Sequence, residues 1–134
     1  MRTFSLTVAT PDGIAYEGEA TAFLARTSAG DVEILAGHTD YLAALATGRA
    51  SIRTDDGTVR CAALSGGTLS VKGGVVSVAA TTFEYAEDID RKRAERAKEK
   101  AESAIRSAAD ERSLRLAKAK LERALLRMNV ADDR

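Results

Sequence analysis

Few side chains in this 134-residue sequence could perform chemistry by themselves. His38 is the single histidine and Cys61 the single cysteine, a set too small for a structural zinc site. Cys61 cannot form an internal disulfide, which favours a reducing compartment. His38 could act as a general base, but no Ser or Cys nucleophile with a known signature accompanies it, so a structural or interfacial role is favoured. We therefore expect no catalytic residue in this chain.

A cationic stripe near the C-terminus is the clearest charged pattern. Its members are spaced so that several share one flank of a helix: Arg115, Lys118, Arg123 and Arg127. Such a stripe suits an acidic partner, and guanidinium groups can hold phosphate oxygens through two hydrogen bonds at once. The alternative is a solvated helix face, which is the usual reason for a run of charges.

Composition excludes several classes of function. The 20 basic and 20 acidic residues cancel, and aromatic residues make up 4% of the chain, so neither an electrostatic footprint nor a stacking platform for nucleic acid is present. The glycines match neither phosphate-binding pattern, G-x-x-x-x-G-K-[ST] or G-x-G-x-x-G. No apolar stretch is long enough to span a bilayer, and the N-terminus has no leader pattern. We expect a soluble or peripheral protein with no direct membrane insertion and no nucleic-acid partner.

Residues 1–85 have the pattern of short strands. Phe4, Leu6 and Val8 alternate with polar residues, as in a half-buried strand. The segment 10–13 (TPDG) predicts a reversal in which Pro sets φ, Asp makes an Asx-type bond and Gly takes a positive φ. Similar turn signals at 55–57, 65–67 and 72–74 separate further short runs. This half, with six basic and nine acidic residues, predicts an antiparallel β-sandwich or barrel.

Residues 86–134 have a different composition, rich in Ala, Glu, Lys and Arg, without Gly or Pro, and with fourteen basic and eleven acidic residues. Apolar residues recur every three or four positions, which predicts two helices with one narrow seam each. The seams are Ala94, Ala97, Ala101, Ala104, Ala108, and Leu114, Ala117, Leu121, Ala124, Met128, Ala131. We expect a tight reversal at 108–112 with Asp110 as N-cap, although the same seams would also suit one long helix.

The predicted helix pair should be only marginally stable. A buried methyl contributes about 0.8 kcal/mol, so five alanines provide a few kcal/mol before the entropy of ordering. An arm that closes this weakly could be opened by modest binding energy elsewhere, as a population-shift switch requires. The alternative is a static solubilising hairpin.

Several segments resemble the F-type ATP synthase epsilon family, whose mitochondrial counterpart is called delta. Residues 8–18 resemble the family's V-x-T-P-D-G-x-x-Y-E-G, and 65–67 its central S-G-G. Residues 30–38 resemble G-E-x-G-I-L-P-G-H, with Asp31, Glu33 and Ala36 in place of Glu, Gly and Pro. Residues 86–94 resemble A-E-D-I-D-x-x-R-A. The likeness covers nearly the whole chain.

The resemblance implies an α+β fold, with an N-terminal antiparallel β-sandwich of about ten strands over 1–85 and a C-terminal antiparallel two-helix hairpin over 86–134. It further implies a non-catalytic subunit that couples the membrane ring of c subunits to the gamma stalk. The loop from Asp31 to His38 would face ring and stalk, with Asp31 for polar contacts and Ile34 and Leu35 anchoring or filling the core. An opened hairpin, presenting Arg115 and Lys118, would reach the alpha/beta head and block hydrolysis.

Some family members bind ATP in the folded hairpin as a regulatory ligand, and no cofactor is otherwise required. The resemblance places this site at Glu84, Ile89, Asp90, Arg93, Ala94, Arg123 and Arg127. Lys100 stands where an Arg would complete the phosphate cluster. ATP held there would stabilise the closed arm by mass action.

The leading hypothesis is a coupling and inhibitory subunit of a proton-transporting ATP synthase, peripheral to the cytoplasmic face of the bacterial plasma membrane. A free-standing ATP-binding regulatory module is the alternative. It would use Arg93, Arg123 and Arg127 without any rotor.

Overall fold

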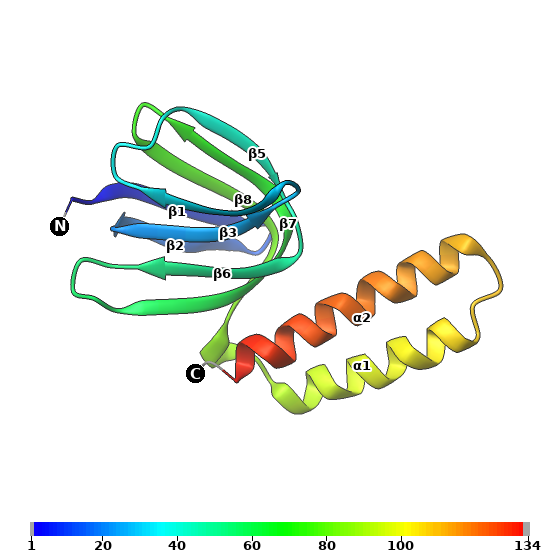
Figure 1. The fold of residues 1–134 in the computed structure, drawn as a ribbon. Coiled ribbons are helices and arrows are strands. Elements are labelled where there is room, and N and C mark those ends of the chain that lie inside the picture. The colour runs from blue at the N-terminus through cyan, green and yellow to red at the C-terminus, as the bar shows by residue number, and fades with distance from the viewer. Residues whose placement is uncertain (1, 133–134) are drawn as a thin grey trace. The chain divides into compact units, whose positions relative to one another are not determined.

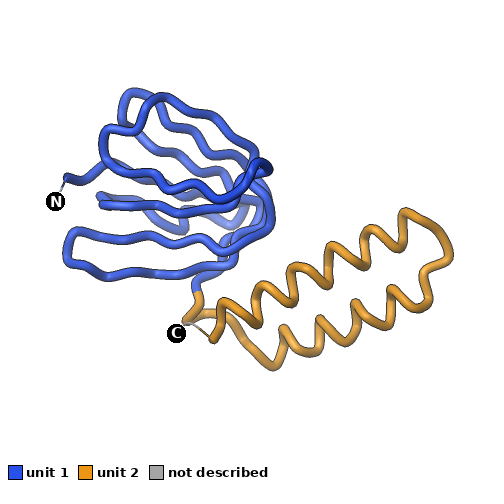
Figure 2. Tube along the Cα trace, in the orientation of Figure 1, with its two compact units in different colours: residues 1–85 blue, residues 86–134 orange. Residues whose placement is uncertain are grey.

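The computed structural model describes residues 2–132, and these form two compact units. The first comprises residues 1–85 and the second residues 86–134 (Figure 2). Strands make up the first unit and helices the second (Figure 1). The boundary follows the change in composition at residue 85, where glycine-punctuated segments give way to strong helix formers. Each unit is described by itself.

The first unit contains eight strands among the described residues, where the family resemblance implied about ten. They are β1 (Phe4–Thr10), β2 (Gly13–Ala20), β3 (Ala22–Thr27), β4 (Gly30–Leu35), β5 (Tyr41–Leu45), β6 (Gly48–Arg53), β7 (Val59–Lys72) and β8 (Val75–Tyr85). Pairing runs in the order β2-β1-β8-β7-β5-β3-β4, and β6 pairs with both β3 and β7. All pairs are antiparallel except β1 with β8, which is parallel. The expected sandwich is thus confirmed, with one parallel pairing inside it.

The two long strands β7 and β8 explain the smaller strand count, because each contributes to both layers (Figure 1). The first part of β7 pairs with β6, and the second part pairs with β5. The transition falls at Ser65, Gly66 and Gly67. The sequence predicted a turn at these residues, and that prediction was wrong, since the chain continues through them as one strand.

Two glycines allow β7 to pass this point. Gly66 and Gly67 have φ of 67° and 120°, which L side chains rarely adopt. A Cβ on Gly67 would lie 2.0 Å from the carbonyl oxygen of Ala79 on β8. The missing side chain therefore allows the two strand backbones to approach each other closely.

The other turn predictions hold, with one change of detail. The reversal at 10–13 joins β1 to β2, and those at 55–57 and 72–74 join β6 to β7 and β7 to β8. In the first, the side chain that bonds the turn is Thr10 and not Asp12. The Thr10 hydroxyl accepts from the amide of Asp12 and donates to the carbonyl of Gly13, both at 3.2 Å.

The core of the sandwich consists mainly of aliphatic side chains, with Phe4 and Phe23 among them. The predicted inward face of β1, formed by Phe4, Leu6 and Val8, is buried. Its largest fully buried partners are Phe23, Ile34, Ile52, Leu64 and Leu69. Period-two alternation thus identified the correct face of the strand.

The second unit is an antiparallel helical hairpin. A 3₁₀ turn, η1 (Ala86–Asp88), precedes α1 (Arg91–Arg106) and α2 (Glu111–Ala131). Asp90 caps α1 by accepting from the amide of Arg93, and Asp110 caps α2 by accepting from the amide of Ser113 at 2.7 Å. The reversal and the Asp110 cap are therefore confirmed, and the hairpin is the form observed in place of one long helix.

The seam between the helices buries fewer residues than the sequence pattern assigned to it. Ala94 and Ala101 on α1, and Ala117 and Ala124 on α2, are buried at seven-residue spacing. Ala104, assigned to the seam from its spacing, is exposed. A strict four-and-three repeat drifts around a straight helix, so a residue near the end of the contact turns outward.

Candidate functional site

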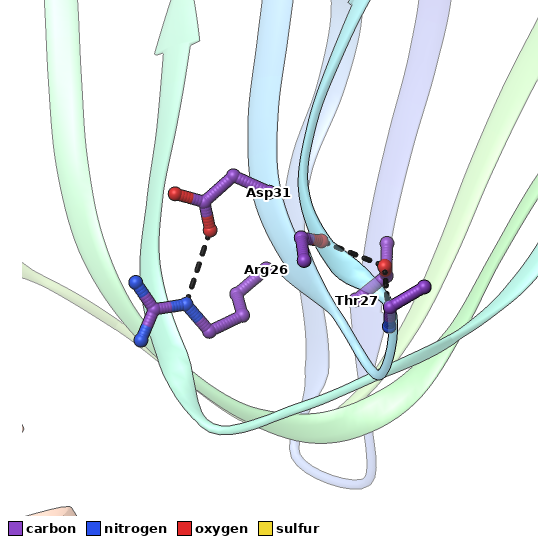
Figure 3. Close-up of polar contacts among 5 residues, drawn as sticks. Arg26, Thr27 and Asp31 are labelled. Carbon is purple, nitrogen blue, oxygen red and sulfur yellow. Dashed lines mark hydrogen bonds and ion pairs between the residues drawn. The ribbon is translucent and has the colours of Figure 1, made fainter.

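The segment from Asp31 to His38 is a strand with a turn after it, not a loop. β4 contains Asp31, and its partner β3 places Arg26 directly opposite. The Arg26 Nε donates to Asp31 Oδ1 at 3.0 Å, with both side chains more than half exposed (Figure 3). Asp31 is therefore one member of a surface ion pair. A partner that binds here would contact both Arg26 and Asp31, and not an isolated carboxylate.

The β3–β4 turn that presents this pair is closed by Thr27. Its buried hydroxyl donates to the carbonyl of Gly30 at 2.7 Å and accepts from the amide of Ala29 at 3.1 Å (Figure 3). A threonine that bonds its own turn fixes the register of the hairpin. The positions of Arg26 and Asp31 follow from that register.

Ile34 and Leu35 point to opposite sides of the sheet, as neighbours in a strand must. Ile34 is fully buried in the core, so its side chain fills the sandwich and does not face a partner. Leu35 is 51% exposed and is the residue of this pair available for an apolar contact. Of the two roles expected for these residues, the structure gives core filling to Ile34 alone.

His38 lies in the turn after β4 and is half-buried. Its amide donates to the carbonyl of Leu35, and its Nδ1 lies 2.7 Å from the carbonyl oxygen of Thr39. The ring packs edge-on against Tyr41 at 5.6 Å between centroids. These contacts orient the imidazole as a rigid surface element.

The cations expected to meet acidic segments lie on α2. Arg115 and Lys118 are exposed in its first half, whereas Arg123 and Arg127 are half-buried in its second half. The stripe therefore has two parts: an exposed pair available to a macromolecule, and a more enclosed pair one helical turn apart. The second pair presents two guanidinium groups from a single face.

The residues expected to hold ATP divide between the units. Glu84 lies on β8 in the first unit, and the other six lie in the second. Asp90 is committed to capping α1, and the Ala94 methyl is fully buried in the seam. Ala94 thus acts by letting the helices approach, and not by touching a ligand with its side chain.

Three of the residues expected to hold ATP have guanidinium groups, which can bind phosphate oxygens. Arg93 is exposed in the first turn of α1, while Arg123 and Arg127 share one face of α2. Ile89 is buried next to the 3₁₀ turn, and Lys100 is exposed on α1. A guanidinium group can hold phosphate oxygens through two hydrogen bonds at once, whereas the ammonium of Lys100 is a point charge.

Two residues with evident structural roles were absent from the sequence-based set. Arg26 was missed, although a two-residue turn at 28–29 would have placed it opposite Asp31. Arg91 was missed because its contacts lie 37 and 41 positions further along the chain, at Met128 and Asp132. No local pattern predicts such a contact.

Within residues 2–132, no group of three potential metal ligands is gathered in one place. Neither of the described helices combines the length and apolar character needed to cross a membrane.

Comparison with known families agrees over both units. Residues 3–86 match the model for the "ATP synthase, Delta/Epsilon chain, beta-sandwich domain". Residues 87–132 match the model for the "ATP synthase, Delta/Epsilon chain, long alpha-helix domain". The ATP synthase epsilon chain of Ruminococcus albus is 38% identical over 98% of each chain, and that of Bacillus velezensis is 37% identical, also over 98% of each.

Solved structures show the same fold. A chain in the Euglena gracilis mitochondrial ATP synthase, in a structure of the OSCP, F1 and c-ring, has a TM-score of 0.79 and 26% identity. The match covers 90% of the present chain and 76% of that one. A chain from the central stalk and c-ring of the Tetrahymena thermophila enzyme has a TM-score of 0.67 over 97% of both chains, at 17% identity.

Proposed function

Because the chain belongs to the delta/epsilon chain family of F-type ATP synthases, we propose that it couples the c-ring to the gamma stalk and regulates ATP hydrolysis through its hairpin. Epsilon chains are non-catalytic subunits of the central stalk. The single observation that carries the proposal is the match of both units, in order, to the two domains of this family.

The sandwich is the proposed attachment unit. Its β4 edge presents the Arg26–Asp31 ion pair, the exposed side chain of Leu35 and the oriented ring of His38. An exposed leucine beside polar groups with fixed geometry is a surface suited to a protein partner. We assign gamma and the c-ring as these partners, at the cytoplasmic face of the bacterial plasma membrane.

Attachment is tested by mixing the purified chain with the gamma subunit and c-ring of the same organism and measuring co-elution. Leu35→Asp should weaken the complex, because it places a charge in an apolar contact. Val59→Asp is the matched control, because the exposed fraction of Val59, 49%, nearly equals the 51% of Leu35. Val59 lies at the start of β7 and not on β4. The proposal fails if the unmodified chain co-elutes with neither partner.

The hairpin is the proposed regulatory unit. The buried positions of its seam are alanines, and α2 exposes Arg115, Lys118 and the apolar side chains of Leu116 and Leu125. An arm held by a thin seam, with cations and leucines outside it, is suited to engaging an acidic surface when it opens. We propose that the alpha/beta head is that surface.

Inhibition is tested by adding the chain to the alpha, beta and gamma subunits and measuring ATP hydrolysis. The charge reversal Arg115→Glu with Lys118→Glu should relieve inhibition while leaving co-elution with gamma unchanged. Lys92→Glu with Arg96→Glu is the control, because it changes the net charge equally from exposed positions on α1. Equal relief by both variants would show an effect of net charge only.

We propose in addition that the hairpin binds ATP as a regulatory ligand, with Arg93, Arg123 and Arg127 holding the phosphates. The pairing of Arg123 and Arg127 on one helix face supports this assignment. Bound ATP would favour the closed hairpin, since a ligand stabilises the form that it binds.

Calorimetric titration with millimolar ATP tests the site. Arg123→Ala with Arg127→Ala should abolish the binding heat, and Arg96→Ala, an exposed arginine on α1, should preserve it. No heat with the unmodified chain would remove the ATP proposal and leave the rotor assignment intact. ATP binding without co-elution with gamma would favour a free-standing ATP-binding module.

A further inference from the structure

Arg91, the first residue of α1, joins both ends of the hairpin where the two helices meet. Its Nη1 donates to the carbonyl oxygen of Met128 at 3.0 Å and lies 3.1 Å from Asp132 Oδ1, both at the end of α2. Its Nε lies 3.3 Å from Glu95 Oε1, one turn further along α1. One guanidinium thus contacts three groups on two helices.

Apart from the Asp90 cap of α1, the charges at these two helix ends are unfavourable for each helix alone. The first turn of α1 contains no acidic residue and begins with the basic residues Arg91, Lys92 and Arg93. The last turn of α2 contains no basic residue, and its C-cap is Asp132. A helix dipole favours the opposite arrangement, with acids at the N-terminus and bases at the C-terminus.

The antiparallel hairpin corrects both ends at once. Arg91 supplies the cation that the end of α2 lacks and bonds one of its terminal carbonyl groups. Asp132 adds a second carboxylate to the one that the Asp90 cap provides at the start of α1, where three basic residues follow one another. The benefit exists only while the two ends are together, since α1 alone keeps three basic residues after its cap and α2 alone keeps Asp132 at its C-cap.

We propose that Arg91 is a latch that holds the hairpin closed without any nucleotide, by exchanging end charges between α1 and α2. Opening of the arm then begins with the release of Met128 and Asp132 from Arg91. The regulatory meaning of the latch rests on the proposed function of the hairpin, but its existence does not.

Native-state hydrogen exchange of the full chain, followed by NMR without ATP or gamma, tests the latch. Arg91→Ala should speed exchange of the amides in the last turn of α2 by about threefold to tenfold. This factor corresponds to the free energy that a partly exposed, charged hydrogen bond contributes. Amides of β7 and β8 should not change, which provides an internal control in the same spectrum. Arg96→Ala is the matched control, because it removes one exposed arginine from the same helix.

Two further measurements separate a latch from a simple helix-end effect. Without tertiary contacts, removing a cation from the first turn should stabilise α1, so unchanged or slower exchange in Arg91→Ala would overturn the proposal. Raising salt from about 0.05 to 0.5 M should speed exchange in the unmodified chain and much less in Arg91→Ala, because salt screens exposed ion pairs. Equal salt responses would refute the ionic component.

The lysine variant tests the fork of the guanidinium. Arg91→Lys keeps the charge but not the planar set of donors, so its exchange rate should fall between those of the unmodified chain and Arg91→Ala. A rate equal to the unmodified chain would refute the need for three simultaneous contacts. Failure to bind gamma or ATP would leave all these rates unaffected, which keeps this test separate from those of the proposed function.

Discussion

Substitution of Gly67 by alanine is the sharpest test of the path that β7 takes through the sandwich. An added Cβ would lie 2.0 Å from the carbonyl oxygen of Ala79, and 2.9 Å from that carbonyl carbon and from the Cα of Ala80. Carbon–oxygen contacts normally exceed about 3.3 Å, so β7 and β8 would have to separate by roughly 1 Å. Because the obstacle is backbone, no side chain can rotate away.

Two costs combine at this position. A non-glycine residue at φ of 120° costs about 1–3 kcal/mol, and forcing an extra methyl into a packed site costs about 1–3 kcal/mol more. We expect Gly67→Ala to lower the free energy of unfolding by about 2–6 kcal/mol. Domains of this size are stable by about 5–15 kcal/mol, so this loss is large.

Gly57→Ala is the matched control, because Gly57 also has a positive φ, 86°, but nothing lies within 4 Å of its Cβ position. Gly57→Ala should carry only the backbone cost of the positive φ, about 1–3 kcal/mol as at Gly67. The difference between the two variants therefore isolates the clash with β8.

Urea unfolding followed by tyrosine fluorescence measures this difference. All three tyrosines, Tyr16, Tyr41 and Tyr85, lie in the first unit and the chain has no Trp, so the signal reports the sandwich without the hairpin. Gly67→Ala should unfold at clearly lower urea than Gly57→Ala. Equal midpoints would refute the close approach of β7 to β8.

Three more predictions concern the hairpin and the turns. Ala101→Leu should destabilise the hairpin by about 1–3 kcal/mol by overfilling the seam, whereas Ala104→Leu on its exposed face should change little; helical circular dichroism on heating compares them. The Ser113 amide donates to Asp110 and holds the pKa of that carboxyl below its usual value. The Asp110 cap therefore stabilises α2 at neutral pH, and this stabilisation is lost as pH falls from about 4 through the lowered pKa. In the same melts, Asp110→Asn should keep the cap but lose this sensitivity to acid. Hydrogen bonds from Thr54 and Thr58 lower the pKa of Asp56 to about 2, and a carboxyl NMR titration that finds an ordinary aspartate value would contradict this turn geometry.

Local chemistry made much of the fold predictable. Alternation in β1 identified its buried face, and Pro and Gly marked the reversals at 10–13, 55–57 and 72–74. Asp110 was recognisable as a cap because the groups that it satisfies lie three residues away. In each case the interacting groups are close in sequence, so composition and spacing contain the necessary information.

The candidate site was predictable only in part. The family motif at 30–38 marked the segment but was expected to be a loop, whereas residues 30–35 form β4. Which of Ile34 and Leu35 faces the core depends on how β4 pairs with β3. Likewise, the spacing that assigned Ala104 to the seam does not include the drift of a straight helix. The division of the cationic stripe into an exposed and a half-buried pair follows from helix packing.

The sequence by itself determined the change from strands to helices at residue 85, the places where the chain reverses and the family to which it belongs. Only the tertiary structure decided that β7 runs through Gly66 and Gly67 into a second layer, and that Arg91 meets Met128 and Asp132. A glycine pair looks the same in a turn and in a strand that passes close to a neighbour. An arginine at a helix start likewise gives no local sign of a partner about 40 residues away. These choices depend on which distant backbones come together, and that is a property of the packed chain.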